Sequence, residues 1–318
     1  MDLSRRRFLL SQATAFSGVA ALYSSGPRLM AAEEAPPEAV ATGSIVLGAA
    51  GISSTDGDGR LRSGAIAFST KDGSWRFLTP IVGPFRLSPD CRRLALLDIN
   101  RHSIWACDLA DGSTRQLADL DGLPVWSPDG SMLMISALPP HDAHPKLAGQ
   151  TYETWKVKWG GGPPDRVELP AADFVSDWSS DGSWFALRTY LSEPVPGTQI
   201  FVCRPDGSER RQLTSERAYH SSARFAPDGK SVVYIRQSKE GSSIWVNSLD
   251  GKSPRRILLE PIQYRYQVCW APDGERIAFT RLDTKANRTT VELVALKTLE
   301  RTPLNAPAGL HGGCDWRC

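Results

Sequence analysis

Five residues with polar, reactive side chains lie at matching places in a pattern that recurs along the chain. Each stands five positions before a bulky apolar residue of the repeat, and the five are Asp121, Asp173, His220, Arg265 and His311. Imidazole and carboxylate groups are ligands for divalent metal ions, and together with a guanidinium they also suit a polar ligand. If the pattern folds into a ring, these side chains are predicted to meet at the mouth of a central channel. Two interpretations stay open: a ligand or metal site, or a polar, water-filled channel lining.

The pattern itself is a turn motif, best seen in Trp126-Ser127-Pro128-Asp129-Gly130. Related copies begin at Leu87, Trp178, Phe225 and Trp270, and a truncated copy begins at Trp316. Proline presets φ at the second position of a turn, aspartate accepts hydrogen bonds from nearby backbone, and glycine adopts φ > 0. An alternating apolar run follows each complete copy, which predicts a strand. We therefore expect strand, tight turn and strand, with turn aspartates that are structural rather than catalytic.

A second signature lies between the copies, where an apolar segment precedes an Asp-Gly pair. Examples are Ile104-Trp105-Ala106 before Asp111-Gly112 and Ile244-Trp245-Val246 before Asp250-Gly251. Each adds a second hairpin, so the repeat unit is a four-stranded antiparallel sheet. The turn aspartates fall at positions 90, 129, 181, 228 and 273, and periods of about 40 to 50 residues with four strands per unit predict propeller blades.

The two ends of the repeat region predict how the ring closes. A strand at Ile45 to Gly48 precedes the first hairpin, but no turn motif of the Trp126 type stands ahead of it. The missing innermost strand is expected at the other end, where Trp316 aligns with Trp270. The sequence thus predicts an all-β, six-bladed β-propeller of four-stranded antiparallel blades, whose N-terminal blade is completed by the C-terminal strand.

These repeats resemble those of the TolB-like family of six-bladed propellers, which carry the same Trp-Ser-Pro-Asp-Gly turn, over about residues 44–318. The resemblance implies the propeller fold and a role in which a rigid ring binds a protein or cell-envelope partner. The repeats are also similar to those of oligogalacturonate lyases, which form a larger ring. That second resemblance implies an alternative, a metal-assisted lyase or hydrolase acting on a glycan at the channel mouth.

Residues 1–32 match a twin-arginine export signal. Ser4-Arg5-Arg6-Arg7-Phe8-Leu9 fits the signal pattern, and a mildly apolar run follows it. Cleavage is expected after Ala31 or Ala32, which leaves no membrane span and a periplasmic or secreted protein. Residues 33–43 are predicted to be a disordered leader and residues 44–318 the propeller.

Charge and missing motifs narrow the function further. Without residues 1–32 the chain keeps 33 basic and 34 acidic side chains, which argues against a nucleic-acid partner. The sequence contains no Gly-x-Ser-x-Gly elbow, no phosphate-binding loop and no Cys-x-x-Cys pair. We expect a non-catalytic binding platform, and the sequence names no cofactor.

Strand parity predicts which connections share a face of the ring. Turns between strands one and two and between three and four lie on one side, and all other connections lie on the opposite side. The long insertions all fall on that opposite side: Ala50 to Ser63, Ala137 to Glu153, Thr189 to Thr198 and Leu282 to Thr289. Irregular loops on a rigid scaffold are common binding sites, so the partner is expected on this loop-rich face.

Two smaller features have competing interpretations. His141 and His144, in the longest insertion, are either metal ligands or ordinary polar loop residues. Among six cysteines, Cys91 and Cys318 lie near the predicted seam. They are expected either to form a disulfide that locks the ring or to be small buried side chains.

Overall fold

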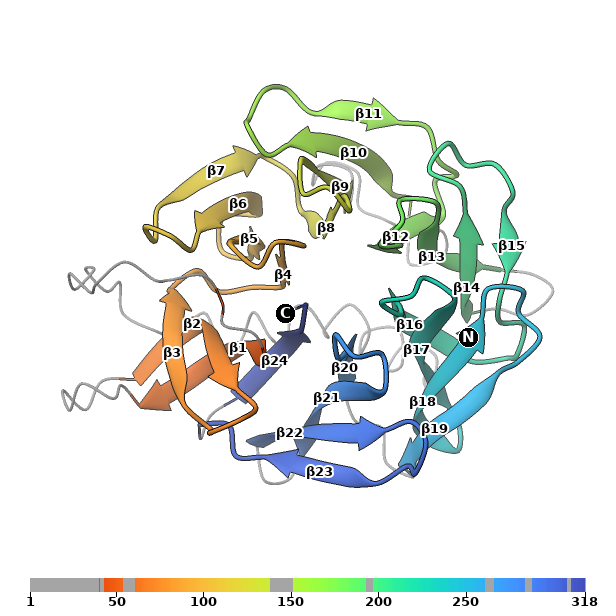
Figure 1. The fold of residues 1–318 in the computed structure, drawn as a ribbon. Helices are drawn as coiled ribbons and strands as arrows, with labels where there is room; N and C mark the ends of the chain where they lie inside the picture. Colours follow the sequence, from red (N-terminus) through yellow and green to blue (C-terminus); the bar gives the residue numbers. More distant parts are fainter. Residues whose placement is uncertain are drawn as a thin grey trace, which may run out of the picture.

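The computed structural model describes residues 40, 43–53, 61–137, 151–192, 197–260, 266–283, 288–307 and 310–317. These residues form six four-stranded antiparallel sheets around a central axis, which confirms the predicted propeller (Figure 1). The described part contains no helix long and apolar enough to cross a membrane. The predicted export signal and His141 and His144 lie outside the described residues.

The blades are numbered here from the N-terminal one, each from the channel outward. Blade 1 holds β24 (Leu310–Asp315), β1 (Ser44–Ser53), β2 (Leu61–Ser69) and β3 (Trp75–Thr79). Blade 2 holds β4 (Phe85–Leu87), β5 (Arg93–Asp98), β6 (Ser103–Asp108) and β7 (Thr114–Ala118). Blade 3 holds β8 (Gly122–Trp126), β9 (Met132–Ala137), β10 (Glu153–Lys158) and β11 (Asp165–Val167).

The second half of the ring repeats this order. Blade 4 holds β12 (Asp173–Trp178), β13 (Phe185–Leu191), β14 (Gly197–Cys203) and β15 (Arg211–Gln212). Blade 5 holds β16 (Tyr219–Phe225), β17 (Ser231–Ser238), β18 (Gly241–Ser248) and β19 (Arg255–Glu260). Blade 6 holds β20 (Tyr266–Trp270), β21 (Arg276–Asp283), β22 (Arg288–Ala295) and β23 (Arg301–Leu304).

The turn motif has the predicted chemistry. In blade 3 the amides of Ser131 and Met132 donate to Asp129 Oδ1 (3.0 Å) and Ser127 Oγ (3.1 Å), and Gly130 has φ +67°. The hydroxyl of Ser127 is the largest of several hydrogen bonds that lower the pKa of Asp129. The carboxylate of the turn aspartate therefore accepts hydrogen bonds within its own turn, as a structural residue does. In blade 2 the glycine position holds Cys91, which adopts a left-handed φ of +58°.

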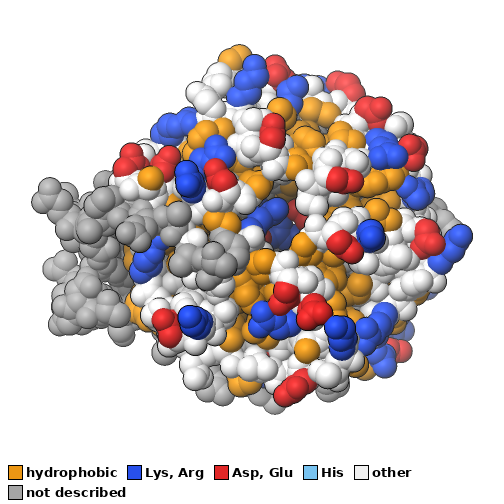
Figure 2. Space-filling model, viewed as in Figure 1, with side chains coloured by type: hydrophobic (Ala, Val, Ile, Leu, Met, Phe, Trp, Pro, Cys, Tyr) orange, Lys and Arg blue, Asp and Glu red, His pale blue; other side chains and the backbone are white. Residues whose placement is uncertain are grey.

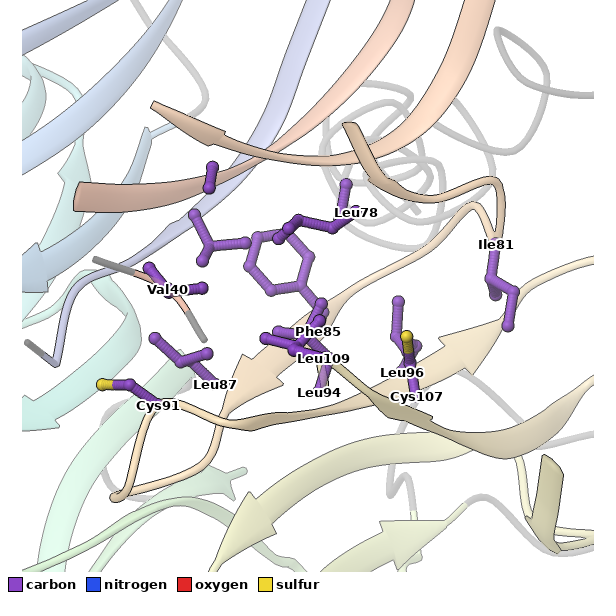
Figure 3. Packing of buried hydrophobic residues seen from close by; sticks show 13 residues of the cluster. Val40, Leu78, Ile81, Phe85, Leu87, Cys91, Leu94, Leu96, Cys107 and Leu109 are labelled. Atoms are coloured by element: carbon purple, nitrogen blue, oxygen red, sulfur yellow. The ribbon is translucent and has the colours of Figure 1, made fainter. Parts of the chain in front are cut away.

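The hydrophobic core lies between neighbouring blades. Blades 1 and 2 share one cluster, in which Phe85 and Leu87 of β4 meet Val46 and Leu78 of blade 1 (Figure 3). Burying one such side chain contributes about 2 kcal/mol, and the remaining clusters join blades in the same way around the ring. Val40 also belongs to this first cluster, and its amide donates to Cys91 O (3.1 Å).

The C-terminal strand closes the ring as predicted. Strand β24 pairs antiparallel with β1, in a register that places Asp315 opposite Val46 and Leu310 opposite Ala50. Trp316, just after the strand, is 5% exposed and packs in a cluster shared by blades 6 and 1. The ring therefore has no open sheet edge along its inner circumference at this seam.

The disulfide predicted at the seam is present at Cys91, but its partner is not described. Cys91 is bonded in a disulfide, and Cys107, Cys203, Cys269 and Cys314 are free and buried. Cys318, the predicted partner of Cys91, lies outside the described residues. The identity of that partner stays a prediction.

The long connections join strands two and three of their blades. They link β1 to β2, β9 to β10, β13 to β14 and β21 to β22, so antiparallel order brings them to one face, which is called the loop-rich face below. The strands extend further into these connections than the sequence indicates, since β1 reaches Ser53 and β2 begins at Leu61. The opposite face, with its Pro-Asp-Gly and Asp-Gly turns, is called the turn face.

Candidate functional site in the central channel

The innermost strands β4, β8, β12, β16, β20 and β24 line the centre of the ring, and polar residues occur at both ends of these strands. The set predicted from the sequence lies where these strands begin, on the loop-rich side. A second set lies where they end, next to the turn face.

Asp121 immediately precedes β8 and pairs with a histidine of the neighbouring blade. Its Oδ2 atom lies 2.7 Å from Nδ1 of His102, in the turn between β5 and β6. The two side chains are 37% and 54% exposed. Solvent therefore reaches both, and His102 is a polar residue of the loop-rich face that the sequence analysis did not select.

Asp173 begins β12 and is fully buried. Arg210 donates to both of its carboxylate oxygens, from Nη2 (2.7 Å) and Nε (3.2 Å), and Thr189 Oγ1 donates to Oδ1 (2.6 Å). The Arg210 guanidinium also stacks on Phe201, 3.8 Å from the ring centroid. Such a bidentate pair satisfies the carboxylate within its own blade. Asp173 therefore fixes the segment before β15 onto the strands β12 to β14.

His220 lies near the start of β16 and its side chain is fully buried. Nδ1 lies 2.8 Å from the carbonyl oxygen of Thr198, and because a carbonyl only accepts, Nδ1 carries the hydrogen. Nε2 faces Glu216 Oε2 at 3.4 Å. The interaction with His220 is the largest cause that lowers the pKa of the Glu216 carboxyl to about 2, although burial acts in the opposite direction.

The predicted convergence of the five residues is not decided by these contacts. Asp121, Asp173 and His220 each have a partner of their own, and within the described part of the chain no hydrogen bond or ion pair joins them. Arg265 lies outside the described residues, and for His311 only the backbone is described, opposite Ala49. The described residues contain no group of three or more His, Cys, Asp or Glu side chains arranged to hold a metal ion.

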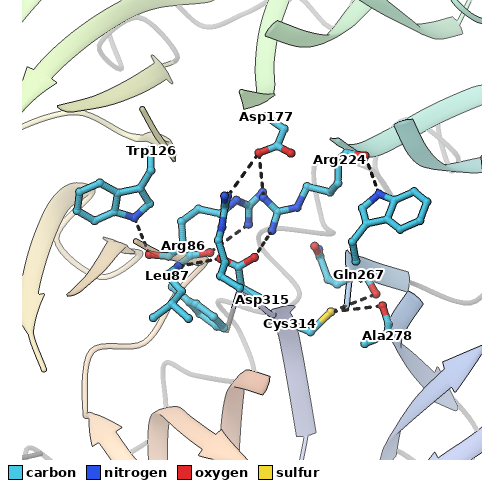
Figure 4. Close-up of polar contacts among 12 residues, drawn as sticks. Arg86, Leu87, Trp126, Asp177, Arg224, Gln267, Ala278, Cys314 and Asp315 are labelled. Carbon is cyan, nitrogen blue, oxygen red and sulfur yellow. Dashed lines mark hydrogen bonds and ion pairs between the residues drawn. The ribbon is translucent and has the colours of Figure 1, made fainter. Parts of the chain in front are cut away.

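The second set is a cluster of ion pairs across the channel, called the channel cluster here (Figure 4). Its members are Arg86 on β4, Asp177 on β12, Arg224 on β16, Asp315 on β24 and Arg317 just after β24. Arg224 contacts Asp315 at 2.8 Å and Asp177 at 3.5 Å. Arg317 lies 3.7 Å from Asp177 and 3.8 Å from Asp315. The cluster therefore connects blades 1, 4 and 5 through the centre of the ring.

Backbone amides hold both carboxylates in place. Leu87 N donates to Asp315 Oδ2 and Phe225 N donates to Asp177 Oδ2, each at 2.8 Å. Through these bonds Asp315 ties the closing strand to blade 2, and Asp177 ties blade 4 to blade 5.

Electrostatic interactions inside the channel cluster are strong because Asp177, Arg224 and Asp315 are buried. Burial raises the pKa of Asp315, but the charges of Arg224, Arg317 and Arg86 outweigh burial and lower this pKa below its ordinary value. For Arg224, burial lowers the pKa, and the carboxylates of Asp315 and Asp177 raise it overall. For Arg86 the balance is reversed: burial, followed by the charge of Arg224, lowers the pKa to about 10.

The sequence does contain a signal for this cluster. Arg86, Asp177, Arg224 and Asp315 each stand one position before the apolar residue that opens the turn motif. The pairing registers confirm that these positions are equivalent, because Leu87, Trp178 and Phe225 each pair with the start of the next strand. Val125 and Cys269 occupy the position in blades 3 and 6. Comparing the repeats column by column would have found four charged residues in one column.

A family model described as TolB beta propeller domain matches residues 74–316 of this chain. The chain is also similar to a Bacillus subtilis (strain 168) protein named Uncharacterized peptidase YuxL, with 24% identity over 159 residues. That match covers 47% of this chain and 21% of the relative, so the chain spans about a fifth of the length of the curated relative it matches.

Two solved structures share the fold. The putative TolB from Agrobacterium tumefaciens is 18% identical with a TM-score of 0.65, and the match covers 86% of this chain and 93% of that one. TolB from Acinetobacter baumannii is 14% identical with a TM-score of 0.67, over 85% of this chain and 66% of that one. The family model covers most of the blades described above, and the chain therefore belongs to the TolB beta propeller domain family.

Proposed function

We propose that this protein is an exported, non-catalytic binding platform that holds a protein or cell-envelope partner on its loop-rich face. The observation that carries the proposal is the segregation of the connections. Short, internally hydrogen-bonded turns form one face, and the four long connections all leave the ring from the other. A rigid scaffold that presents its variable loops on one side is a common design for binding.

Further support comes from the polar residues on that face. His102 and Asp121 form an exposed pair between blades 2 and 3, and Arg217 and Lys239 are exposed in blade 5. Charged groups around an interface steer association and select partners. Membership of the TolB beta propeller domain family supports a rigid propeller as the scaffold for this surface.

Charge reversal on each face provides the test. The double variant Arg217→Glu/Lys239→Glu changes the loop-rich face, and Lys230→Glu/Lys252→Glu makes the same change in net charge on the turn face. After chemical cross-linking in the periplasm, the first variant is expected to lose the proteins that wild type captures, and the second is expected to keep them. Equal capture by both variants would overturn the proposed surface.

The metal-assisted glycan lyase or hydrolase stays an untested alternative. Likeness of fold at these identities carries no activity with it. A ligand- or metal-binding role for His311 and Arg265 also remains a prediction, because their side chains lie outside the described residues.

A further inference from the structure

The channel cluster holds more positive than negative charge. It contains three guanidinium groups and two carboxylates, so the described residues leave one positive charge in excess. The ion pairs with Asp177 and Asp315 involve Arg224 and Arg317 but not Arg86. The excess charge can therefore be assigned to a single residue.

Arg86 is the member of the cluster that makes no direct ion pair with a described carboxylate. Its Nη1 donates to the carbonyl oxygen of Phe85 (3.1 Å), its Nε is buried without a hydrogen-bond partner, and it makes no ion pair with any described residue. Nη1 of Arg224 also lacks a hydrogen-bond partner, but it lies 3.5 Å from Asp177 Oδ1, which lacks one too, so this donor already faces a carboxylate. Burying a guanidinium without a paired anion is costly. The unsatisfied Nε of Arg86, in a cluster with one positive charge in excess, indicates that an anion completes the cluster.

The arginines Arg86 and Arg317 are more accessible to solvent than the other members of the cluster. Asp177, Asp315 and Arg224 are at most 5% exposed, whereas the Arg317 side chain is 24% exposed and Arg86 is half-buried. Figure 2 shows basic and acidic side chains at the bottom of the central opening. A small ligand that enters the channel therefore meets the arginines before the carboxylates.

The chemistry of these donors selects a class of ligand. A guanidinium presents two parallel N–H groups that match the two oxygens of a carboxylate. One negative charge neutralises the cluster, whereas a phosphate dianion would leave it with one negative charge in excess and face two buried carboxylates. We propose that Arg86, with Arg224 and Arg317 beside it, binds a carboxylate group in the central channel. This inference goes beyond the partner surface and does not depend on it, because the cluster lies at the opposite ends of the innermost strands.

The first experiment measures acetate binding by titration calorimetry and by the shift of the thermal unfolding midpoint, at constant ionic strength. Wild type is expected to bind acetate saturably and to unfold at a higher temperature in its presence. Arg86→Gln is expected to weaken acetate binding by about tenfold or more, the equivalent of one charged hydrogen bond. Arg92→Gln, which removes an exposed arginine from the turn of the same blade, is expected to bind acetate like wild type.

Stability separates lost binding from lost folding. Because Arg86 has no ion pair to lose, Arg86→Gln without ligand is expected to unfold at the same temperature as wild type or a higher one. A folded Arg86→Gln that binds acetate as tightly as wild type would overturn the proposal. So would a wild-type protein that does not bind acetate saturably.

A change of charge tests the ligand class. Asp177→Asn raises the excess from one positive charge to two, and the amide oxygen can still accept the bond from Phe225 N. Wild type is expected to prefer acetate to inorganic phosphate, and Asp177→Asn is expected to reverse this order. An unchanged order in the folded variant would contradict the charge argument.

The source of the carboxylate is tested with a short peptide that has either a free or an amidated C-terminus. Tighter binding of the free peptide than of acetate, lost on amidation, assigns the carboxylate to the end of a polypeptide. Weaker binding than acetate assigns it to a free small carboxylate. Failure of both acetate and the peptide to bind overturns the site.

Discussion

At the scale of single residues, the partner of a polar side chain decides what that side chain does. Asp173 and Asp129 are both carboxylates that the repeat places regularly, yet one holds Arg210 and the other holds a turn. Asp315 does more, because one oxygen accepts from Leu87 N and the other pairs with Arg224. The carboxylates that matter most for the ring are therefore those that connect different blades.

We predict that Asp315→Asn destabilises the protein and removes part of its sensitivity to acid. Asparagine can still accept the bond from Leu87 N, but it cannot compensate the buried charge of Arg224, which costs about 3 kcal/mol. The folded-state pKa of Asp315 lies below its ordinary value of 3.8. Its stabilising contribution is therefore complete above about pH 4 and is lost as the pH falls through the lower folded-state pKa.

The measurement is the free energy of unfolding in urea at several pH values between neutral and acid. Asp273→Asn is the control, because its pair with Arg276 is 35% and 43% exposed and such pairs contribute less than about 1 kcal/mol. If both variants lose the same small amount, the channel cluster is not important for stability.

At the scale of elements, one turn departs from the others. Gly130, Gly182, Gly229 and Gly274 have φ between +66° and +77° at the last position of the motif, and blade 2 has Cys91 there with φ +58°. A residue with a Cβ atom pays about 1 kcal/mol in this conformation. Cys91, the residue with this backbone strain, is also the residue that forms a disulfide.

We predict opposite effects of Cys91→Gly in oxidising and reducing conditions. Without reductant, loss of the disulfide is expected to cost about 5 kcal/mol in the chain-entropy model for a loop that ends at Cys318. With reductant, wild type has no disulfide, and Cys91→Gly is expected to be more stable by about 1 kcal/mol because the strain is relieved. Cys91→Ser is the matched control, since it loses the disulfide and keeps the strain.

Urea unfolding with and without reductant gives all of these differences. Alkylation of the unfolded, unreduced protein followed by mass spectrometry identifies the partner, which is expected to be Cys318. A Cys91→Ser variant as stable as unreduced wild type would show that the disulfide contributes nothing.

The elements were predictable because their signals are local. Proline, aspartate and glycine mark each turn, alternation marks each strand, and the period gives the blade count and the closing strand. The same period predicted which residues lie at equivalent positions on the innermost strands. It did not predict the hydrogen-bond partners of these residues. Arg210, for example, reaches Asp173 from a segment 37 residues away, and no spacing rule relates the two. The channel cluster was overlooked because each arginine or aspartate in it resembles an ordinary surface residue when its repeat is considered alone.

At the scale of the whole molecule, the N- and C-terminal strands must pair before the ring is complete. Strands β1 and β24 are the pair that closes blade 1, and they lie at opposite ends of the propeller sequence. Contacts between distant parts of a chain form slowly. If the protein is exported after folding, strands β1 and β24 are already paired when it crosses the membrane. This agrees with the predicted twin-arginine signal at residues 1–32.

We therefore predict that Arg5→Lys/Arg6→Lys keeps the protein in the cytoplasm, because the paired arginines are the defining part of the predicted signal. Cell fractionation and immunoblotting measure the distribution, and the retained protein is expected to resist proteolysis because it has already folded. Arg7→Lys is the matched control, since this position varies in the signal pattern, and it is expected to be exported and cleaved like wild type. Export of the double variant at the wild-type level would contradict the twin-arginine assignment, and a retained but protease-sensitive protein would contradict folding before export.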